Sequence, residues 1–409
     1  MSVRRLAMLS VHTSPLAQPG AGDGGGMNVY VRALGAALAR AGIACDVLTR
    51  AEHAEQAPVV VVEPGFRVVH VPAGPLAPVP KQALPELVDA FADAALDHVA
   101  GNGGGYHVLH GNYWISGAVG HRLKHELDLP LATTFHTLDR VKAEAGVGDD
   151  PAERARVEGE VVRCADLMVA STDEEREQLV SLYDADRDRI EIVPPGVDHR
   201  VFRPGDAAAA RHALGLDAAA RLLLFVGRIQ PLKGADLAVR VLAELGDPDA
   251  VLLVVGGPSG TDGEAELDRL HELVGDLGVA GQVRFVPPQP HAALATYYQA
   301  ADVCLVPSRT ESFGLVALEA AACGTPVVAA AVGGLPSVVA DGETGFLVDG
   351  RAADDYAALV ALVFDDGELA TALSRNAVAR SAGYTWSITA ARLRRLYGDL
   401  VVREPVQCS

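Results

Sequence analysis

Two glutamates, Glu311 and Glu319, lie eight positions apart around the sequence Ser312-Phe313-Gly314. On one helix this spacing is a little over two turns, so both carboxylates would face the same way. The residues between them are typical of a loop that enters a helix, where free backbone N–H groups can bind a diphosphate. Carboxylates beside that anion can accept hydrogen bonds from hydroxyl groups. The pattern predicts a binding site for a ligand that carries a diphosphate and hydroxyl groups. An amphipathic helix with two solvated glutamates would have the same spacing.

Two cations follow another apolar segment. Arg228 and Lys233 lie five positions apart, around Pro231, just after the predicted strand 221–226. At the carboxyl end of a strand they suit a diphosphate leaving group, because its departure builds negative charge there. Two exposed basic residues on a loop are the alternative. Because the chain is acidic and also carries the two glutamates, a binding site is favoured over two merely exposed basic residues.

A glycine-rich loop, residues 23–27, separates the predicted strand 5–11 from the helical pattern 28–40. Glycines let the backbone approach a ligand closely and expose N–H groups at the start of a helix. The loop lacks the G-x-G-x-x-G spacing of a dinucleotide site. A tight turn without a ligand explains it equally well.

His136 follows the predicted strand 131–135. A lone histidine is usually structural, but ligands bind at the carboxyl ends of strands in α/β domains, which favours a functional role. Arg154 and Glu158 have helical i,i+4 spacing and could form no more than a salt bridge. They belong to a dispersed polar set whose convergence the sequence cannot show: His12, Lys81, Tyr113, Arg154 and Glu158.

The candidates lie in an alternation of short apolar runs and helical patterns, which indicates βαβ units with parallel sheets. The length of 409 residues favours two domains. We predict an α/β fold of two Rossmann-like, doubly wound domains, residues 1–195 and 196–385, that face each other across a cleft. A last helix within 386–409 could pack on either. The predicted strands are 5–11, 43–49, 59–62, 66–71, 106–110, 131–135, 221–226, 250–255, 283–286, 303–306 and 326–330.

Composition excludes several classes of partner. The 34 basic and 53 acidic residues give a formal charge of −19, which disfavours nucleic acid and anionic membranes, so local cations must hold any phosphate. An apolar run long enough to span a membrane is missing.

The cysteines show no C-x-x-C spacing, which indicates free thiols, a reducing cytoplasm and no structural metal. These five are Cys45, Cys164, Cys304, Cys323 and Cys408.

Taken together, the motifs resemble those of the retaining family 4 glycosyltransferases of GT-B fold. In the second half the matching segments are RIQPLK (228–233), GGPSG (256–260), ESFGLVALE (311–319) and VGGLP (332–336). In the first half, SVHTSPLAQPG (10–20) and GGMNVY (25–30) resemble the branch that acts in mycothiol biosynthesis. The resemblance runs over nearly the whole chain.

The resemblance implies transfer of N-acetylglucosamine from UDP-N-acetylglucosamine to 1D-myo-inositol 3-phosphate, with retention at the anomeric carbon. The nucleotide sugar is a substrate, so no cofactor is expected, and no metal-binding DxD-type motif stands out, which predicts no catalytic metal. A homodimer is left open. The resemblance assigns catalysis to His136, Glu311, Arg228 and Lys233. It assigns donor binding to Gln18, Pro19, Gly26, Arg228, Lys233, Glu311, Ser312, Phe313, Gly314 and Glu319. It assigns acceptor binding to His12, Asp23, Gly25, Gly26, Met27, Asn28, Lys81, Tyr113, Thr137 and Arg154.

Departures from the family pattern fall on the acceptor side, while the donor side is intact. They lie at 110–114, 133–137, 141–143 and in a shortened loop, 144–153. A paralogue from antibiotic or other specialised metabolism, with a thiol or aminocyclitol acceptor and a GDP-sugar donor, is therefore an alternative. A glycoside phosphorylase and a non-catalytic nucleotide-sugar-binding protein are others, and the intact donor residues disfavour the last.

Overall fold

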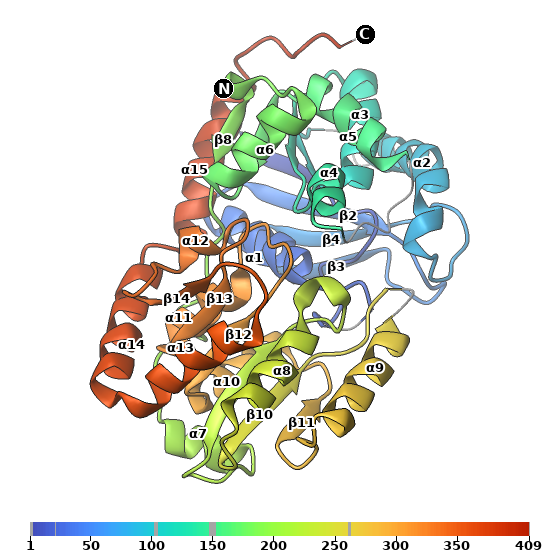
Figure 1. Ribbon diagram of the computed structural model, residues 1–409. Coiled ribbons are helices and arrows are strands. Elements are labelled where there is room, and N and C mark those ends of the chain that lie inside the picture. The colour runs from blue at the N-terminus through green and yellow to red at the C-terminus, as the bar shows by residue number, and fades with distance from the viewer. Residues whose placement is uncertain (1–2, 21, 102–104, 147–152, 261–262, 409) are drawn as a thin grey trace. The chain divides into compact units, whose positions relative to one another are not determined.

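The computed structural model describes residues 3–20, 22–101, 105–146, 153–260 and 263–408. The chain forms two compact α/β units (Figure 1). Unit 1 comprises Met1–Ala17, Met27–Gly196 and Trp386–Ser409, and unit 2 comprises Gln18–Gly26 and Val197–Thr385. The segment Gln18–Gly26 therefore belongs to unit 2, although its position in the sequence suggests the first domain.

Unit 1 is built on an eight-stranded sheet of order β3-β4-β2-β1-β5-β6-β7-β8, in which only β3 is antiparallel to its neighbour. Its strands are β1 (Arg5–Leu9), β2 (Ala44–Arg50), β3 (Val59–Glu63), β4 (Phe66–Val71), β5 (Val108–Asn112), β6 (Leu131–Thr134), β7 (Leu167–Ala170) and β8 (Ile190–Ile192). Its helices are α1 (Gly26–Arg40), α2 (Val88–Gly101), α3 (Trp114–Leu127), α4 (Asp139–Glu144), α5 (Arg154–Cys164), α6 (Asp173–Tyr183) and α15 (Trp386–Leu400), with 3-10 turns η1 (Lys81–Leu87) and η2 (Arg187–Arg189).

Unit 2 has a parallel six-stranded sheet of order β11-β10-β9-β12-β13-β14. Its strands are β9 (Arg221–Val226), β10 (Ala250–Val255), β11 (Val283–Val286), β12 (Val303–Val306), β13 (Val327–Ala330) and β14 (Gly345–Val348). Its helices are α7 (Ala207–Ala213), α8 (Ala235–Leu245), α9 (Gly263–Asp276), α10 (Leu294–Ala300), α11 (Leu315–Cys323), α12 (Leu335–Val338), α13 (Ala353–Asp365) and α14 (Gly367–Ser381), with turns η3 (Pro231–Lys233) and η4 (His291–Ala293).

The strand order reverses once in each sheet. In unit 1 the chain starts at β1, adds β2 on one side and later adds β5 on the other; in unit 2, β9 is flanked by β10 and β12 in the same way. Ligands of doubly wound sheets bind at the carboxyl ends of the strands where the order reverses. The candidate residues that follow β1, β5, β9 and β12 therefore lie where this architecture binds ligands.

The last helix completes the core of unit 1. Trp386, Leu393 and Tyr397 of α15 are buried with residues of α1 and of the first strands. The Trp386 ring meets the Tyr30 ring edge-on, with centroids 5.6 Å apart. Thus the helix that the sequence could assign to either domain belongs to the first.

Cysteine pairing differs from the sequence-based prediction. Cys164, at the end of α5, and Cys408, in the carboxyl-terminal tail, form a disulfide with Cα atoms 5.2 Å apart. Cys45, Cys304 and Cys323 are free and buried. The prediction of five free thiols was wrong for this pair, because 244 positions separate its members and only the path of the tail brings them together.

His110 links the sheet of unit 1 to α15 inside the core. One ring nitrogen, Nδ1, lies 2.6 Å from the Tyr397 hydroxyl, and Nε2 lies 2.8 Å from Thr134 Oγ1. Burial lowers the pKa of His110 to about 3, since no water is left to solvate the imidazolium. The folded protein therefore holds this histidine neutral, whereas the unfolded chain protonates it below pH 6.5.

This difference makes the stability of unit 1 depend on pH. Between pH 6.5 and 3 the unfolded state binds a proton at His110 that the folded state does not bind, so the unfolding free energy falls as the pH falls. From pH 7 to pH 5, we expect the wild type to lose about 2 kcal/mol more unfolding free energy than His110→Asn. Urea unfolding followed by tryptophan fluorescence reports on unit 1, which contains both tryptophans. Equal pH dependence of the unfolding free energy in the two proteins would contradict the conclusion that His110 is neutral in the folded protein.

Candidate functional site

An ion pair joins two loops at the strand ends of unit 2. Lys233 closes η3 after β9, and Glu311 follows β12, the neighbouring strand. The Lys233 ammonium lies 2.7 Å from Glu311 Oε2, and the Ser308 hydroxyl lies 3.4 Å from the same oxygen. Both charged side chains remain partly exposed, so a ligand can reach them. The structure thus brings together the predicted cation and the predicted carboxylate.

Glu311 and Glu319 do not share a helix. The helix α11 begins at Leu315, and Gly314 precedes it in the left-handed region, with φ 102° and ψ 54°. The loop between the carboxylates was predicted correctly, but the two-turn spacing does not apply because Glu311 lies before the helix. Since Gly314 offers no capping side chain, the start of α11 is suited to binding an anion through backbone N–H groups.

Glu319 is buried on α11 and is held from two sides. His291 Nε2 lies 2.6 Å from Oε1, and the Tyr298 hydroxyl donates a hydrogen bond of 2.9 Å to Oε2. Burial, and then the charge of Glu319, raise the pKa of Tyr298, so this phenol stays protonated and keeps donating. These contacts hold the carboxylate inside unit 2 rather than leaving it in solvent.

Two glycines support the Glu311 loop, and the candidate list from the sequence missed them. The Gly334 N–H donates to the Glu311 carbonyl at 2.8 Å. A Cβ on Gly333, whose φ is +51°, would lie 2.0 Å from that carbonyl oxygen. The signal was present as the Gly-Gly pair of the VGGLP segment, whose close approach to another backbone is typical of glycine.

Arg228 contacts the glycine-rich segment, and both belong to unit 2. A Cβ on Gly25 would lie 3.2 Å from Arg228 Nε. The Arg228 guanidinium is 3.4 Å from Ser259 Oγ, and the Ser259 hydroxyl donates to the Gly22 carbonyl. At the other end of the segment, the Gln18 amide donates to the Gln289 carbonyl. Residues of unit 2 thus hold the segment Gln18–Gly26 at Gln18 and at Gly22 and Gly25.

In unit 1, the acceptor candidates converge on the ring of Tyr113, which follows β5. The His12 ring centroid is 4.5 Å from that of Tyr113, and the Lys81 ammonium lies 5.2 Å from the ring centre. The Arg154 guanidinium carbon lies 4.9 Å from it. Residues from η1, α5 and the ends of β1 and β5 thus form one basic, aromatic cluster.

Arg154 is fully buried and every nitrogen of its guanidinium has a partner. Nε donates to Glu158 at 2.7 Å, one terminal nitrogen to the Tyr113 hydroxyl at 3.1 Å, and the other to the Thr137 carbonyl at 2.7 Å and hydroxyl at 3.1 Å. Burial raises the pKa of Glu158, against the opposing effect of Arg154. The predicted i,i+4 salt bridge exists, and it positions Arg154 to orient the Tyr113 and Thr137 hydroxyls.

Two residues of this site have strained backbones. Tyr113 has φ 78° and ψ 158°, a region that glycine alone occupies readily, and His136 has φ 62°. Such conformations cost about 1–3 kcal/mol each and are common at functional sites. They follow the neighbouring parallel strands β5 and β6, so both lie at the same edge of the sheet.

His136 is half-buried beside Asn112 and Tyr30. Its Nε2 lies 3.0 Å from Asn112 Oδ1, and its ring meets Tyr30 edge-on at 4.8 Å. Desolvation, together with His110, lowers the pKa of His136 to about 3. The ring is therefore neutral at neutral pH, and when Nε2–H is donated to Asn112 the proton-free nitrogen is Nδ1.

The remaining acceptor candidates have other surroundings. Asn28 is buried on α1, where its amide donates to Thr13 Oγ1 at 2.8 Å and to the Ser14 carbonyl at 2.7 Å. It therefore shapes the loop after β1. Met27 packs partly against the core of unit 1, and Asp23 is exposed. Of the rewritten loop 144–153, residues 147–152 lie outside the described residues.

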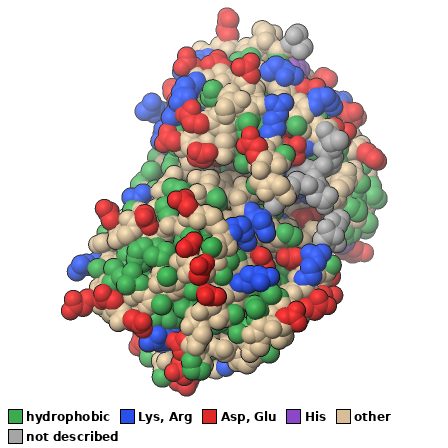
Figure 2. Space-filling view, in the orientation of Figure 1, with side chains coloured by type: hydrophobic (Ala, Val, Ile, Leu, Met, Phe, Trp, Pro, Cys, Tyr) green, Lys and Arg blue, Asp and Glu red, His purple; other side chains and the backbone are tan. Residues whose placement is uncertain are grey.

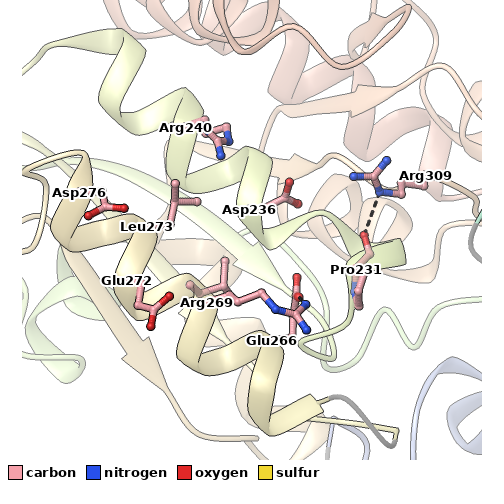
Figure 3. A pocket seen from close by; sticks show the side chains of 10 residues that line it. Pro231, Asp236, Arg240, Glu266, Arg269, Glu272, Leu273, Asp276 and Arg309 are labelled. Atoms are coloured by element: carbon pink, nitrogen blue, oxygen red, sulfur yellow. Dashed lines mark hydrogen bonds and ion pairs between the residues drawn. The ribbon is translucent and has the colours of Figure 1, made fainter.

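A groove of about 380 Å³ lies between α8 and α9, beside the turn that carries Lys233 (Figure 3). Two of its arginines have partners within the groove: Arg269 lies 2.6 Å from Glu266, and Arg309 donates to the Pro231 carbonyl at 3.3 Å. Figure 2 likewise shows acidic and basic side chains intermingled over the visible face. We assign the groove no ligand, because its three arginines are accompanied by four acidic residues, so the lining carries no excess of positive charge.

Family models match both halves of the chain. Residues 25–196 match "Glycosyl transferase 4-like domain" and residues 206–380 match "Glycosyl transferases group 1". Among solved structures, sucrose-phosphate synthase from Thermosynechococcus elongatus is 35% identical, with a TM-score of 0.91 over 98% of this chain and 99% of its own. Anabaena HepE in complex with UDP-glucose is 20% identical, with a TM-score of 0.78 over 97% and 100%. The protein is a glycosyltransferase of GT-B fold.

The curated relatives identify a more specific family within the glycosyltransferases. The D-inositol 3-phosphate glycosyltransferase of Actinosynnema mirum is 49% identical over 99% of this chain and 100% of its own length. That of Mycolicibacterium smegmatis is 48% identical over 98% and 93%. The chain belongs to the D-inositol 3-phosphate glycosyltransferase family. In the described part of the chain, the helices are too short or too polar to cross a membrane.

The contact between Gly333 and Glu311 predicts the effect of one added methyl group. Gly333→Ala should displace the Glu311 loop and weaken binding of a nucleoside diphosphate at the predicted site at least about tenfold, since small displacements of binding groups are costly. Gly342→Ala is the matched control: Gly342 also has positive φ, at +70°, but its Cβ would meet nothing within 4 Å. Titration calorimetry with UDP separates the two. Equal losses in both variants would mean that backbone strain, and not the clash, explains the effect.

Proposed function

We propose that this enzyme transfers N-acetylglucosamine from UDP-N-acetylglucosamine to 1D-myo-inositol 3-phosphate, with retention at the anomeric carbon. The observation that carries the proposal is the Tyr113 cluster, which combines a cation with oriented hydroxyl groups. The names of relatives nearly half identical in sequence support the same acceptor. UDP bound by structural neighbours supports a nucleotide-sugar donor.

The acceptor phosphate would bind on the surface that Arg154 organises. The Tyr113 hydroxyl accepts a hydrogen bond from Arg154, so its own proton is available for a phosphate oxygen. Thr137 is exposed, and its hydroxyl is oriented in the same way. The Lys81 ammonium adds the positive charge that a phosphate dianion requires. Arg154 itself acts through these groups, because Glu158 and its other partners occupy its guanidinium.

The donor diphosphate would bind in unit 2. Lys233, Arg228 and the start of α11 offer cations and N–H groups for the charge that develops on the β-phosphate. They supply this charge without requiring a metal ion or a cofactor. Glu311, held by Lys233, accepts hydrogen bonds from donor hydroxyls.

Retention is explained by attack on the face from which UDP departs. The bond between the anomeric carbon and the β-phosphate oxygen breaks, the inositol oxygen bonds to that carbon, and the departing phosphate takes the inositol proton. Neutral His136 neither supplies charge nor protonates the leaving group. It contributes a hydrogen-bond acceptor and holds the sugar in position. Because both substrates are charged, water-soluble compounds, we expect the reaction in the cytoplasm.

The direct test is turnover with the two substrates. Purified enzyme given UDP-N-acetylglucosamine and 1D-myo-inositol 3-phosphate should release UDP and form one α-linked product, measured by mass spectrometry and NMR. Failure with this acceptor, but turnover with an aminocyclitol or a thiol, would overturn the acceptor and favour the specialised-metabolite alternative. Turnover only with GDP-sugars would overturn the donor.

Tyr113→Phe tests the phosphate contact. The variant keeps the ring that packs on His12 and loses only the hydroxyl, so KM for inositol 3-phosphate should rise at least about tenfold, as expected for a hydrogen bond to a charged group. Steady-state kinetics with inositol 3-phosphate and with myo-inositol provide the comparison. Turnover of myo-inositol, which has no phosphate, and affinity for UDP should change little. A similar loss with both acceptors would argue against phosphate recognition by this hydroxyl.

A further inference from the structure

Four potential metal ligands meet on unit 1, away from the Tyr113 cluster. His121 and His125 lie one turn apart on α3, Cys164 ends α5, and Cys408 comes from the carboxyl-terminal tail. Their ligand atoms all lie within 4.8 Å of one another. His125 Nε2 is 3.4 Å from Cys164 Sγ and 3.2 Å from Cys408 Sγ, and His121 Nε2 is 3.7 Å from Cys408 Sγ.

The fold holds these residues together by contacts of its own. The i,i+4 spacing puts both histidines on one side of α3, the helix that packs against α5. Lys124 of α3 donates to the Cys164 carbonyl and to the Asp166 carboxylate, all at 2.8 Å. Asp166 also accepts a hydrogen bond of 2.6 Å from the Val406 N–H. This last bond anchors the tail two residues before Cys408.

We propose that these four side chains bind a Zn²⁺ ion when the two cysteines are reduced. Two thiolates and two imidazoles form one of the standard tetrahedral zinc sites. In such a site, bond lengths of about 2.3 Å for sulfur and 2.0 Å for nitrogen put neighbouring S and N atoms about 3.5 Å apart. The observed S–N separations of 3.2, 3.4 and 3.7 Å match this distance.

The disulfide and the zinc site exclude each other. Two electrons and two protons from a dithiol reductant convert the Cys164–Cys408 disulfide into two thiols. Zn²⁺ then displaces both thiol protons and binds the two thiolates and the two neutral histidines. The sulfurs must move apart, and the half-exposed tail residue Cys408 can do so more easily than buried Cys164. A structural metal was not expected from the sequence because no short spacing joins the two cysteines.

The position of the site suggests a structural role. It fastens the carboxyl-terminal parts of α3 and α5, the helices whose first turns follow or contain Tyr113 and Arg154. Cys164 lies ten residues beyond Arg154, or about 15 Å along the helix. The ion would therefore hold the two helices and the tail in register without touching the substrates.

Metal content of the full-length protein tests the proposal. After reduction and incubation with Zn²⁺, elemental analysis should find one zinc per chain, and the melting temperature should rise by about 5 °C. Co²⁺ in place of zinc should give sulfur-to-cobalt charge-transfer absorption and the intense visible bands of tetrahedral cobalt. After diamide oxidation, zinc should be absent and peptide mapping should recover the Cys164–Cys408 link.

Variants at the exposed end of the site keep the test independent of folding. Cys408→Ser and His125→Ala should each lose the zinc and the thermal shift while retaining wild-type circular dichroism. Cys323→Ala and His53→Ala, which alter a free cysteine and an exposed histidine elsewhere, should retain both. No zinc in the reduced wild type, zinc unaffected by both site variants, or zinc retained by the oxidised protein would each overturn the proposal.

Discussion

Parallel strand direction is the constraint on which both candidate sites depend. Each strand that is parallel to its neighbours ends at the same edge of the sheet, so the loops that follow these strands meet even when they are distant in sequence. Asn112, the last residue of β5, and His136, which follows β6, come within 3.0 Å of each other in this way, and Lys233 meets Glu311 from loops after β9 and β12. The buried strands themselves are short aliphatic runs, such as RLLLFV and AVLLVV, which explains the low aromatic content.

Within this arrangement, buried charge fixes the geometry of the sites. A guanidinium without water must have partners, and Arg154 draws its partners from α5, the end of β5 and the loop after β6. The Glu319 carboxylate similarly requires His291 and Tyr298. These networks are stabilising only as complete sets, because removing one member leaves another buried polar group unpaired. An acidic protein can thus hold anionic substrates through local cations that its net charge does not reveal.

The sequence predicted most of the fold because hydrophobic alternation and glycine turns are local signals. The strands at 221–226 and 250–255 were predicted to the residue, and the Ser312-Phe313-Gly314 loop was correct. Family motifs supplied the site residues, but not their geometry. The strained backbone of Tyr113, the full partnering of Arg154 and the position of Glu311 before α11 arise from tertiary contacts. Gln18–Gly26 could not be assigned to unit 2 because its contacts, such as Gln18 with Gln289, span hundreds of positions.

The return of α15 to unit 1 affects how the protein is made. A ribosome synthesises all of unit 2 before it reaches Trp386, so until then the nascent first unit lacks the helix that covers one side of its sheet. Unit 2 consists of the early segment Gln18–Gly26 and a continuous later stretch, so all of its residues are available for folding first. The amino-terminal unit must therefore wait, with an apolar surface uncovered, until translation ends. The unit that begins first in the sequence is therefore the last to be complete.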